Sequence, residues 1–140
     1  MPAGRRDGPG DDSVRYRYPM TTTPPFASLD ELRDRLRAFA ATRDWDQFHS
    51  PKNLAMALIA EAAELVEHFQ WLTEDESRAL PPEKTAEVAD EIADVLVYLV
   101  RIADKLGVDL LGAAAAKMDR NETKYPAPLV MGSARKYSEY

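Results

Sequence analysis

The sequence predicts an all-α fold, a single domain in which four helices form a bundle. Apolar residues recur every three or four positions along four segments, which is the periodicity of an amphipathic helix. Capping residues, prolines and a glycine mark the ends of these segments. No segment alternates apolar and polar residues as a strand does, and no repeat of fixed period is present. Four helices joined by short loops typically form a bundle.

The first helix is predicted over residues 28–43. The run Ser28-Leu29-Asp30-Glu31 has the pattern of a capping box, a hydroxyl N-cap followed three residues later by Glu. The apolar side chains of this helix then follow at helical spacing: Leu29, Leu32, Leu36 and Phe39. Residues 42–50, TRDWDQFHS, are polar apart from their large rings and predict a loop.

The second helix is predicted over residues 51–72, because Pro51 suits the first turn of a helix. An α-helix turns about 100° per residue, so side chains can be assigned to faces. The predicted core face of this helix consists of Leu54, Leu58, Ala62, Leu65 and Phe69. Its border carries Glu61, Glu64, His68 and Trp71.

The third helix is predicted over residues 84–106, between a loop with Pro81-Pro82 and the stop at Gly107. It is apolar around most of its circumference, which is typical of a buried helix. Its predicted core face consists of Val88, Ile92, Val95, Leu96, Leu99, Ile102 and Ala103. Asp109 then begins an alanine-rich fourth helix that ends before Pro126.

The chain divides into three parts by composition. Residues 1–25 are rich in Gly, Pro, Asp and Arg and predict a mobile N-terminal tail. Residues 26–126 contain the four helices and form the predicted domain. Residues 127–140 follow as a C-terminal tail.

Composition excludes several classes of protein. The absence of cysteine excludes disulfides, zinc–thiolate sites and thiol catalysis, and two histidines are too few for a histidine-rich metal site. A net charge of -6 argues against duplex nucleic acid as a partner. No apolar run approaches the roughly 20 residues of a membrane helix, and the N-terminus lacks the apolar region of a secretory signal. We expect a cytoplasmic protein.

Two pairs of carboxylates stand out on the otherwise apolar second and third helices. Glu61 and Glu64, and likewise Glu91 and Asp94, have the i, i+3 spacing that places side chains on adjacent turns of one face. Four carboxylates between two helices would repel each other unless a cation lies among them. Oxygen ligands favour Mg²⁺, with Mn²⁺ as a substitute. The pattern therefore predicts a metal site.

Other carboxylates share this spacing, namely the pairs Glu64/Glu67 and Glu87/Asp90. Glu91 and Asp94 are favoured because Tyr98 follows on the same strip. Glu87 lies on that strip too and is predicted beside the site. For one such pair, the simpler interpretation is an ordinary acidic face exposed to solvent. Two pairs, each on an otherwise apolar helix, favour a metal site instead.

Basic and aromatic residues extend this pattern towards a nucleotide. Helical spacing near the end of the fourth helix groups Lys117, Arg120, Asn121 and Lys124, either as a solvated face or as a clamp for polyphosphate. Trp45 and Phe48 could equally fill the core or contact a ligand. Trp71 is the better candidate for stacking, because it lies on the carboxylate side of its helix. Rings, carboxylates and a basic clamp suit the base and metal-bound phosphates of a nucleotide.

Five motifs occur in order over residues 26–140: RDWDQFH, KNLAMALIAEAAELVEHFQW, DEIADVLVYLV, KMDRNETKYP and SARKYSEY. Together they resemble the MazG-like all-α NTP pyrophosphatases, and most closely their dCTP pyrophosphatase branch. The resemblance implies cleavage of a nucleoside triphosphate between the α- and β-phosphates, giving the monophosphate and pyrophosphate. It also implies homo-oligomers, dimers or dimers of dimers (a homotetramer), with sites shared between subunits.

The resemblance also implies site residues. Mg²⁺ would be held by Glu61, Glu64, Glu91 and Asp94, which are also the catalytic residues. The base and sugar would contact Trp45, Gln47, His49, Trp71 and Tyr98. The phosphates would contact Lys117, Asn121, Lys124 and Tyr125, together with Arg135, Lys136 and Tyr137 of the tail. Leu36 stands where the dCTP-selective branch often has a histidine, which leaves the preferred base open.

Two rival interpretations remain. A di-iron carboxylate bundle needs Glu-x-x-His on two helices, but His68 falls four residues after Glu64 and the third helix has no histidine. A non-catalytic helical interaction module would pair the carboxylates with basic side chains of the facing helix, yet both helices carry few of them there. Thermal melts with Mg²⁺ and nucleotide would separate such a module from a binding site.

Overall fold

The computed structural model describes residues 16, 18 and 21–139, so most of the predicted mobile tail over residues 1–25 lies outside the described residues. All regular elements in the described part of the chain are helical, which confirms the all-α prediction. In chain order they are α1 (Leu29–Ala41), η2 (Asp46–Phe48), α2 (Pro51–Glu67), α3 (Glu74–Ser77), α4 (Pro82–Leu106), α5 (Leu110–Lys124), α6 (Ala127–Val130) and η3 (Tyr137–Glu139).

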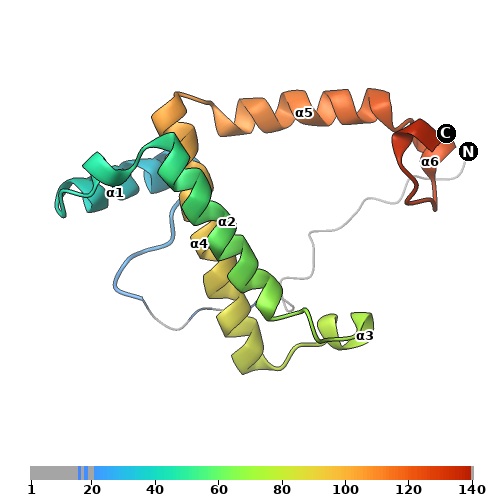
Figure 1. Ribbon diagram of the computed structural model, residues 1–140, viewed down its shortest axis with the longest axis horizontal. Coiled ribbons are helices and arrows are strands. Elements are labelled where there is room, and N and C mark those ends of the chain that lie inside the picture. The colour runs from blue at the N-terminus through green and yellow to red at the C-terminus, as the bar shows by residue number, and fades with distance from the viewer. Residues whose placement is uncertain (1–15, 17, 19–20, 140) are drawn as a thin grey trace, which may run out of the picture.

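An antiparallel pair formed by α2 and α4 is the centre of the molecule (Figure 1). Helix α1 packs against α4 and against η2. Leu54 of α2 and Val100 of α4 are almost completely buried, with 1% and 3% of their surface exposed. The core of the chain therefore lies along the α2–α4 seam and under α1.

The helix starts follow the predicted capping. Ser28 Oγ accepts a hydrogen bond from the Glu31 backbone N–H at 3.1 Å. The Glu31 carboxylate accepts from the backbone N–H of Ala27 at 2.8 Å rather than from that of Ser28, so the capping box is displaced by one residue. Ser50 caps α2 ahead of Pro51, and Asp109 caps α5.

The helix ends differ from the prediction in one place that matters for the site. Helix α2 ends at Glu67, so residues 68–72 form turns instead of a last helical turn. Helix α4 begins at Pro82 and ends where predicted, because Gly107 adopts the left-handed φ of 64° that favours glycine.

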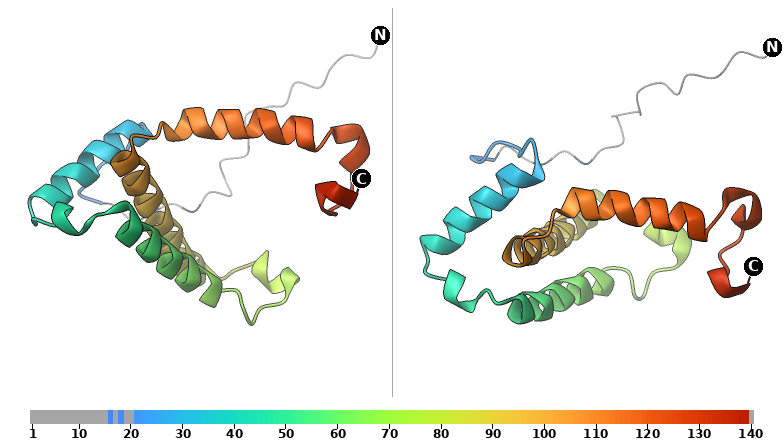
Figure 2. Two further views of the ribbon diagram at one scale, coloured as in Figure 1. Left: turned by 45° about the horizontal axis from the view of Figure 1, so that its top comes forward. Right: turned by 90° about the horizontal axis from the view of Figure 1, so that it is seen from above.

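Helix α5 extends away from the α2–α4 pair as an arm (Figures 1 and 2). Within the described chain it has no interface comparable to those of α1, α2 and α4. The tail beyond residue 126 is not wholly irregular, since it contains α6 and η3. The fourth helix thus leaves the bundle open within one chain.

The core face predicted for α4 is only partly correct. Val88 and Ala103 are buried as expected, but Ile92, Leu96 and Leu99 are 54%, 40% and 39% exposed. Val100, which is not part of the predicted core face, is buried instead. The reason is that α1 and α2 cover one side of α4 and leave the apolar stripe of Ile92, Leu96 and Leu99 uncovered. The described helices include none that is long and apolar enough to cross a membrane.

Candidate metal and nucleotide site

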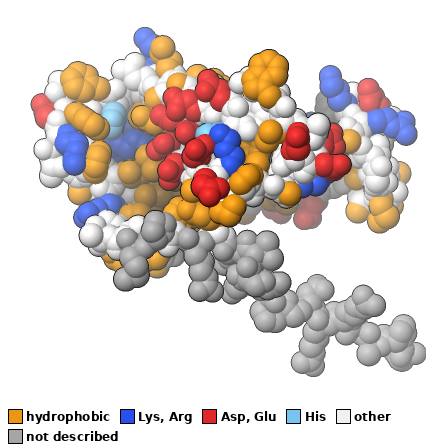
Figure 3. Space-filling model, turned by 90° about the horizontal axis from the view of Figure 1, so that it is seen from below, with side chains coloured by type: hydrophobic (Ala, Val, Ile, Leu, Met, Phe, Trp, Pro, Cys, Tyr) orange, Lys and Arg blue, Asp and Glu red, His pale blue; other side chains and the backbone are white. Residues whose placement is uncertain are grey.

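Helices α2 and α4 bring three of the predicted carboxylates together. One carboxylate oxygen from each of Glu61, Glu64 and Glu91 lies within 4.8 Å of the others. Glu61 and Glu64 come from adjacent turns of α2, and Glu91 faces them from the antiparallel α4. Figure 3 shows acidic side chains gathered on one face of the molecule, with a histidine among them. We call Glu61, Glu64 and Glu91 the acidic trio.

The electrostatics of the acidic trio favour a cation. Burial, and next the negative charges of Asp94, Glu64 and Glu91, raise the pKa of Glu61 above its ordinary value. Glu91 Oε2 is buried and has no hydrogen-bond partner. A divalent ion would neutralise the repulsion and supply that missing partner. The donor set, all carboxylate oxygen, suits a hard cation such as Mg²⁺, and the acidic trio could therefore hold a metal ion.

Asp94, the fourth predicted ligand, lies outside the acidic trio. Its side chain is exposed on α4, yet its charge contributes to the raised pKa of Glu61. Tyr98, one turn further along α4, is half-buried, and burial followed by the charges of Glu61 and Asp94 raises its pKa. Asp94 and Tyr98 therefore flank the acidic trio on the side of Glu61.

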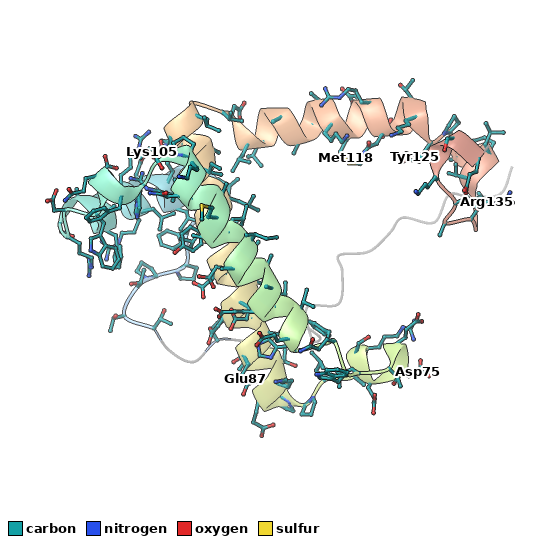
Figure 4. The ribbon with its side chains drawn as sticks, viewed as in Figure 1. Asp75, Glu87, Lys105, Met118, Tyr125 and Arg135 are labelled. Atoms are coloured by element: carbon teal, nitrogen blue, oxygen red, sulfur yellow. The ribbon has the colours of Figure 1, made fainter. Side chains whose placement is uncertain are left out.

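His68, which helical spacing placed on the same border of α2 as Glu64, is a neighbour of the acidic trio that was not predicted as a site residue. Its Nε2 lies 3.7 Å from Glu91 Oε1, and its Nδ1 lies 3.7 Å from Glu87 Oε2. Lys84 donates to the same oxygen of Glu87 at 2.8 Å, and this bond is the main reason that the pKa of Glu87 is lowered. Glu87 thus lies beside the site, as predicted, at the lower end of α4 in Figure 4. The available signal for His68 was its place beside Glu64 on the border of α2.

Trp71 is 87% exposed, because α2 ends before it and the following turn carries it out of the helix. Periodicity placed it on the carboxylate side of a longer helix, and that helical position is wrong. A large ring with so little cover in the single chain remains free to meet a ligand or a second chain.

The aromatic loop around η2 lies at the other end of α2. Trp45 is half-exposed and packs edge-on against Phe39 of α1, with ring centres 5.9 Å apart. Gln47 donates its side-chain amide to the backbone carbonyl of Asp44 at 2.9 Å and to the carboxylate of Asp44 at 2.8 Å. His49 is half-buried.

A network of ion pairs holds this loop to α4. Arg101, only 5% exposed, donates to Asp46, to Asp104 at 2.8 Å and to His49 Nδ1 at 3.2 Å. Lys105 donates to Asp46 at 2.6 Å. This role of Arg101 was not predicted from the sequence. Its one visible signal was a single arginine within an apolar run of the third helix.

The predicted phosphate residues lie on the α5 arm and beyond it. Figure 4 shows Tyr125 and Arg135 at the far end of the arm, well away from Glu87 at the acidic end of α4. Lys117, Lys124 and Lys136 are exposed, and Asn121 is half-buried. The side chain of Tyr137 lies outside the described residues. One chain therefore does not bring its own basic strip to its acidic trio.

Comparison with known proteins places these features in a family. The model of the MazG-like family matches residues 57–140, which include the acidic trio, Asp94 and Tyr98. The chain belongs to the MazG-like family. This MazG-like chain is 41% identical to dCTP pyrophosphatase 1 of Mus musculus, covering 97% of this chain and 81% of that protein. It is 42% identical to dCTP pyrophosphatase 1 of Homo sapiens, covering 96% of this chain and 79% of that protein.

The MazG-like chain also resembles a solved structure. A crystal structure of a pyrophosphatase from Archaeoglobus fulgidus aligns with a TM-score of 0.68 at 40% identity. The alignment covers 76% of this chain and 99% of that one. The likeness therefore extends over nearly the whole of the solved chain.

Proposed function

We propose that this MazG-like protein is a cytoplasmic, Mg²⁺-dependent nucleoside triphosphate pyrophosphohydrolase. It would convert dCTP or a modified dCTP to the monophosphate and pyrophosphate, as a hydrolase of acid anhydrides in nucleotide pool housecleaning. The observation that carries the proposal is the acidic trio with the partnerless, buried oxygen of Glu91. The names of the relatives, dCTP pyrophosphatase 1, support the reaction and the base.

The metal would be held by Glu61, Glu64 and Glu91, with Asp94 completing the set from the exposed side. Mn²⁺ could substitute, because it accepts the same oxygen ligands. The bound ion would supply charge neutralisation at the pyrophosphate leaving group and would ease ionisation of water.

The chain itself would position the attacking water. Glu61 or Glu64 would accept a proton from this water, which attacks the α-phosphorus in line. The bond from the α-phosphorus to the bridging oxygen then breaks, and pyrophosphate departs with that oxygen. The proposal requires no covalent nucleophile.

The nucleotide would lie along α2, from the loop around η2 to the acidic trio. Its base and sugar would contact Trp45, Gln47, His49 and Tyr98, and Trp71, which follows the opposite end of α2, would be contributed by a second copy of the chain. The half-exposed Trp45 and the exposed Trp71 support this part of the proposal, because both rings offer a free surface.

The phosphates would be met by the α5 arm of a second copy of the chain. We therefore propose a homo-oligomer, a dimer or a tetramer made of two dimers, in which Lys117, Asn121, Lys124 and Tyr125 serve a partner's acidic trio. The C-terminal residues Arg135, Lys136 and Tyr137 would join them. Two observations support this arrangement: α5 lacks an extensive interface within its own described chain, and α4 exposes the apolar stripe of Ile92, Leu96 and Leu99.

A non-catalytic interaction module is less well supported. That interpretation needs lysines or arginines opposite the carboxylates, but the ion pairs among the described residues join none to the acidic trio. A different or broader base preference is the other alternative, because Leu36 offers no polar group.

Pyrophosphate release from a panel of canonical and modified NTPs and dNTPs, with Mg²⁺ and with EDTA, tests the proposal. We expect metal-dependent release that favours dCTP or a 5-substituted analogue. Release from other bases would keep the reaction and remove the cytosine assignment. No release from any nucleotide would contradict the enzymatic function and favour the interaction module.

A further inference from the structure

The loop around η2 holds two polar side chains whose hydrogen-bonding direction is set by their neighbours. Gln47 gives its amide N–H groups to the backbone carbonyl and the carboxylate of Asp44, which are both acceptors. Because only the amide nitrogen can face two acceptors, Gln47 Oε1 must point the other way. Gln47 is exposed, so this oxygen is available as an acceptor.

The contacts of His49 leave it a hydrogen-bond donor towards a ligand, whereas those of Gln47 leave an acceptor. Arg101 Nε donates to His49 Nδ1 at 3.2 Å, and a guanidinium carries no acceptor, so Nδ1 must hold a lone pair. The neutral ring then carries its proton on Nε2, which is a donor. Burial, and next the charge of Arg101, lower the pKa of His49. The charge of Lys105 also lowers this pKa, whereas the charge of Asp46 raises it. Because the pKa is lowered from an ordinary value that is already below 7, the ring is neutral at pH 7.

The two residues that orient His49 and Gln47, Arg101 and Asp44, are themselves held in place. Arg101 is 5% exposed and is fixed by Asp46 and Asp104 as well as by His49. Asp44 adopts a left-handed φ of 54°, a conformation that Asp tolerates better than most residues, and this turn brings its carbonyl and carboxylate to Gln47. The polarity of both side chains is therefore decided before any ligand binds.

From these contacts we propose that Asp44 and Arg101 are positioning residues that make the site read cytosine rather than uracil or thymine. The inference rests on the proposed function, in which Gln47 and His49 contact the base. An acceptor at Gln47 and a donor at His49 match the amino group and the ring N3 of cytosine. Uracil and thymine present a carbonyl and an N–H there, so both contacts would be reversed.

The first test needs no activity. ¹⁵N NMR of the metal-free wild-type protein at pH 7 reports the proton on each imidazole nitrogen, and His49→Gln assigns the signals because the chain has two histidines. We expect His49 to be neutral with its proton on Nε2. A proton on Nδ1, or a charged ring, would overturn the proposal.

The second test compares two equivalent substitutions. Arg101→Lys keeps the charge, but a compact ammonium cannot hold His49, Asp46 and Asp104 at once. Arg37→Lys is the matched control, because Arg37 also pairs with Asp104 but does not contact His49 within the described structure. We expect Arg101→Lys to mix the two tautomers of His49 and to reduce the ratio of kcat/KM for dCTP over dUTP about tenfold, as for one lost hydrogen bond.

The control should keep the wild-type ratio and tautomer. An unchanged ratio in Arg101→Lys, or an equal loss in Arg37→Lys, would overturn the role of Arg101. Wild-type protein that releases pyrophosphate equally from dCTP and dUTP would overturn the proposed preference for cytosine, but it would not contradict the pyrophosphohydrolase activity. No release from any nucleotide would instead contradict the proposed function and with it the base reading. The NMR result on His49 separates these cases, since it does not depend on turnover.

Discussion

At the scale of single residues, Glu61 shows how the charges of the acidic trio lower the stability of the metal-free protein. Its pKa is raised, so the folded state binds a proton more readily than the unfolded state does. The stability of the metal-free fold therefore falls as pH rises from the ordinary carboxyl range through the raised pKa of Glu61. A cation in the trio should remove this loss, because it favours the charged carboxylates.

We predict that Glu61→Gln abolishes pyrophosphate release, by at least about a hundredfold, because a general base and ligand is lost. The fold should persist, and the metal-free variant should no longer lose stability over that pH range. The rise in melting temperature on adding Mg²⁺ should also shrink. Activity assays and thermal melts at several pH values measure these effects. Glu67→Gln, the same change on an exposed residue of α2, is the control, and a Glu61→Gln enzyme with most of its activity would contradict the assignment.

At the scale of elements, an ion-pair network joins three pieces that are distant in the sequence. Asp104 of α4 accepts from Arg37 of α1 and from Arg101 of α4, while Asp46 of η2 accepts from Arg101 and Lys105. Asp104 has a side chain only 7% exposed, and the hydrogen bond from Arg37 is the main cause of its lowered pKa. The contacts of Arg101 and Lys105 with Asp46 therefore fix the loop that carries Trp45, Gln47 and His49, while Arg37 joins α1 to α4 through Asp104.

We predict that Asp104→Asn lowers the free energy of unfolding by about 3 kcal/mol, because it leaves the buried Arg101 short of a partner. A lowered carboxyl pKa stabilises the fold above the ordinary Asp pKa, and this contribution is lost as pH falls through the lowered value. The variant should thus lose less stability on acidification than the wild type. Urea unfolding at several pH values measures both effects. Asp90→Asn, an exposed position on the same helix, should change neither, and equal acid sensitivity in Asp104→Asn would refute the prediction.

At the scale of the whole molecule, one chain looks incomplete. The α5 arm extends away from the acidic end of α4 (Figures 1 and 4). Helix α4 exposes the apolar stripe of Ile92, Leu96 and Leu99. Large apolar patches on a soluble chain commonly mark an interface. A second copy would cover the stripe of Ile92, Leu96 and Leu99 and could receive the arm.

We predict that Leu96→Asp converts the oligomer to single chains, because a charge in the apolar stripe would be buried without a partner. Pyrophosphate release should fall with it, although the acidic trio is untouched. Light scattering after size-exclusion chromatography gives the mass. A wild-type protein that is already a single chain, or a Leu96→Asp variant with the wild-type mass, would show that the stripe has another role.

The shared site has its own test. Glu61→Gln and Lys117→Met should each be inactive, because one lacks a metal ligand and the other a phosphate contact. If the arm serves the partner's trio, a mixed oligomer contains one site with neither change, so combining the two variants should restore activity. Mixed oligomers that form without any recovery would place both residues in the site of one chain.

Local chemistry in the sequence determined much of this protein. Helical periodicity predicted the four main helices, and the i, i+3 spacing placed Glu61 and Glu64 on one face. Tyr98 on the same strip was needed to favour Glu91 over Glu87. Capping at Ser28 and Asp109 and the stop at Gly107 depend on residues close in the chain, so they too could be predicted.

The tertiary structure alone decided which faces are covered. Periodicity gives the faces of α4 but not the side on which α1 and α2 pack, so the exposure of Ile92 and the burial of Val100 could not be predicted. The same holds for Arg101, whose partners Asp46 and His49 lie on a loop more than 50 positions earlier. These features depend on contacts between distant segments, which no local pattern records.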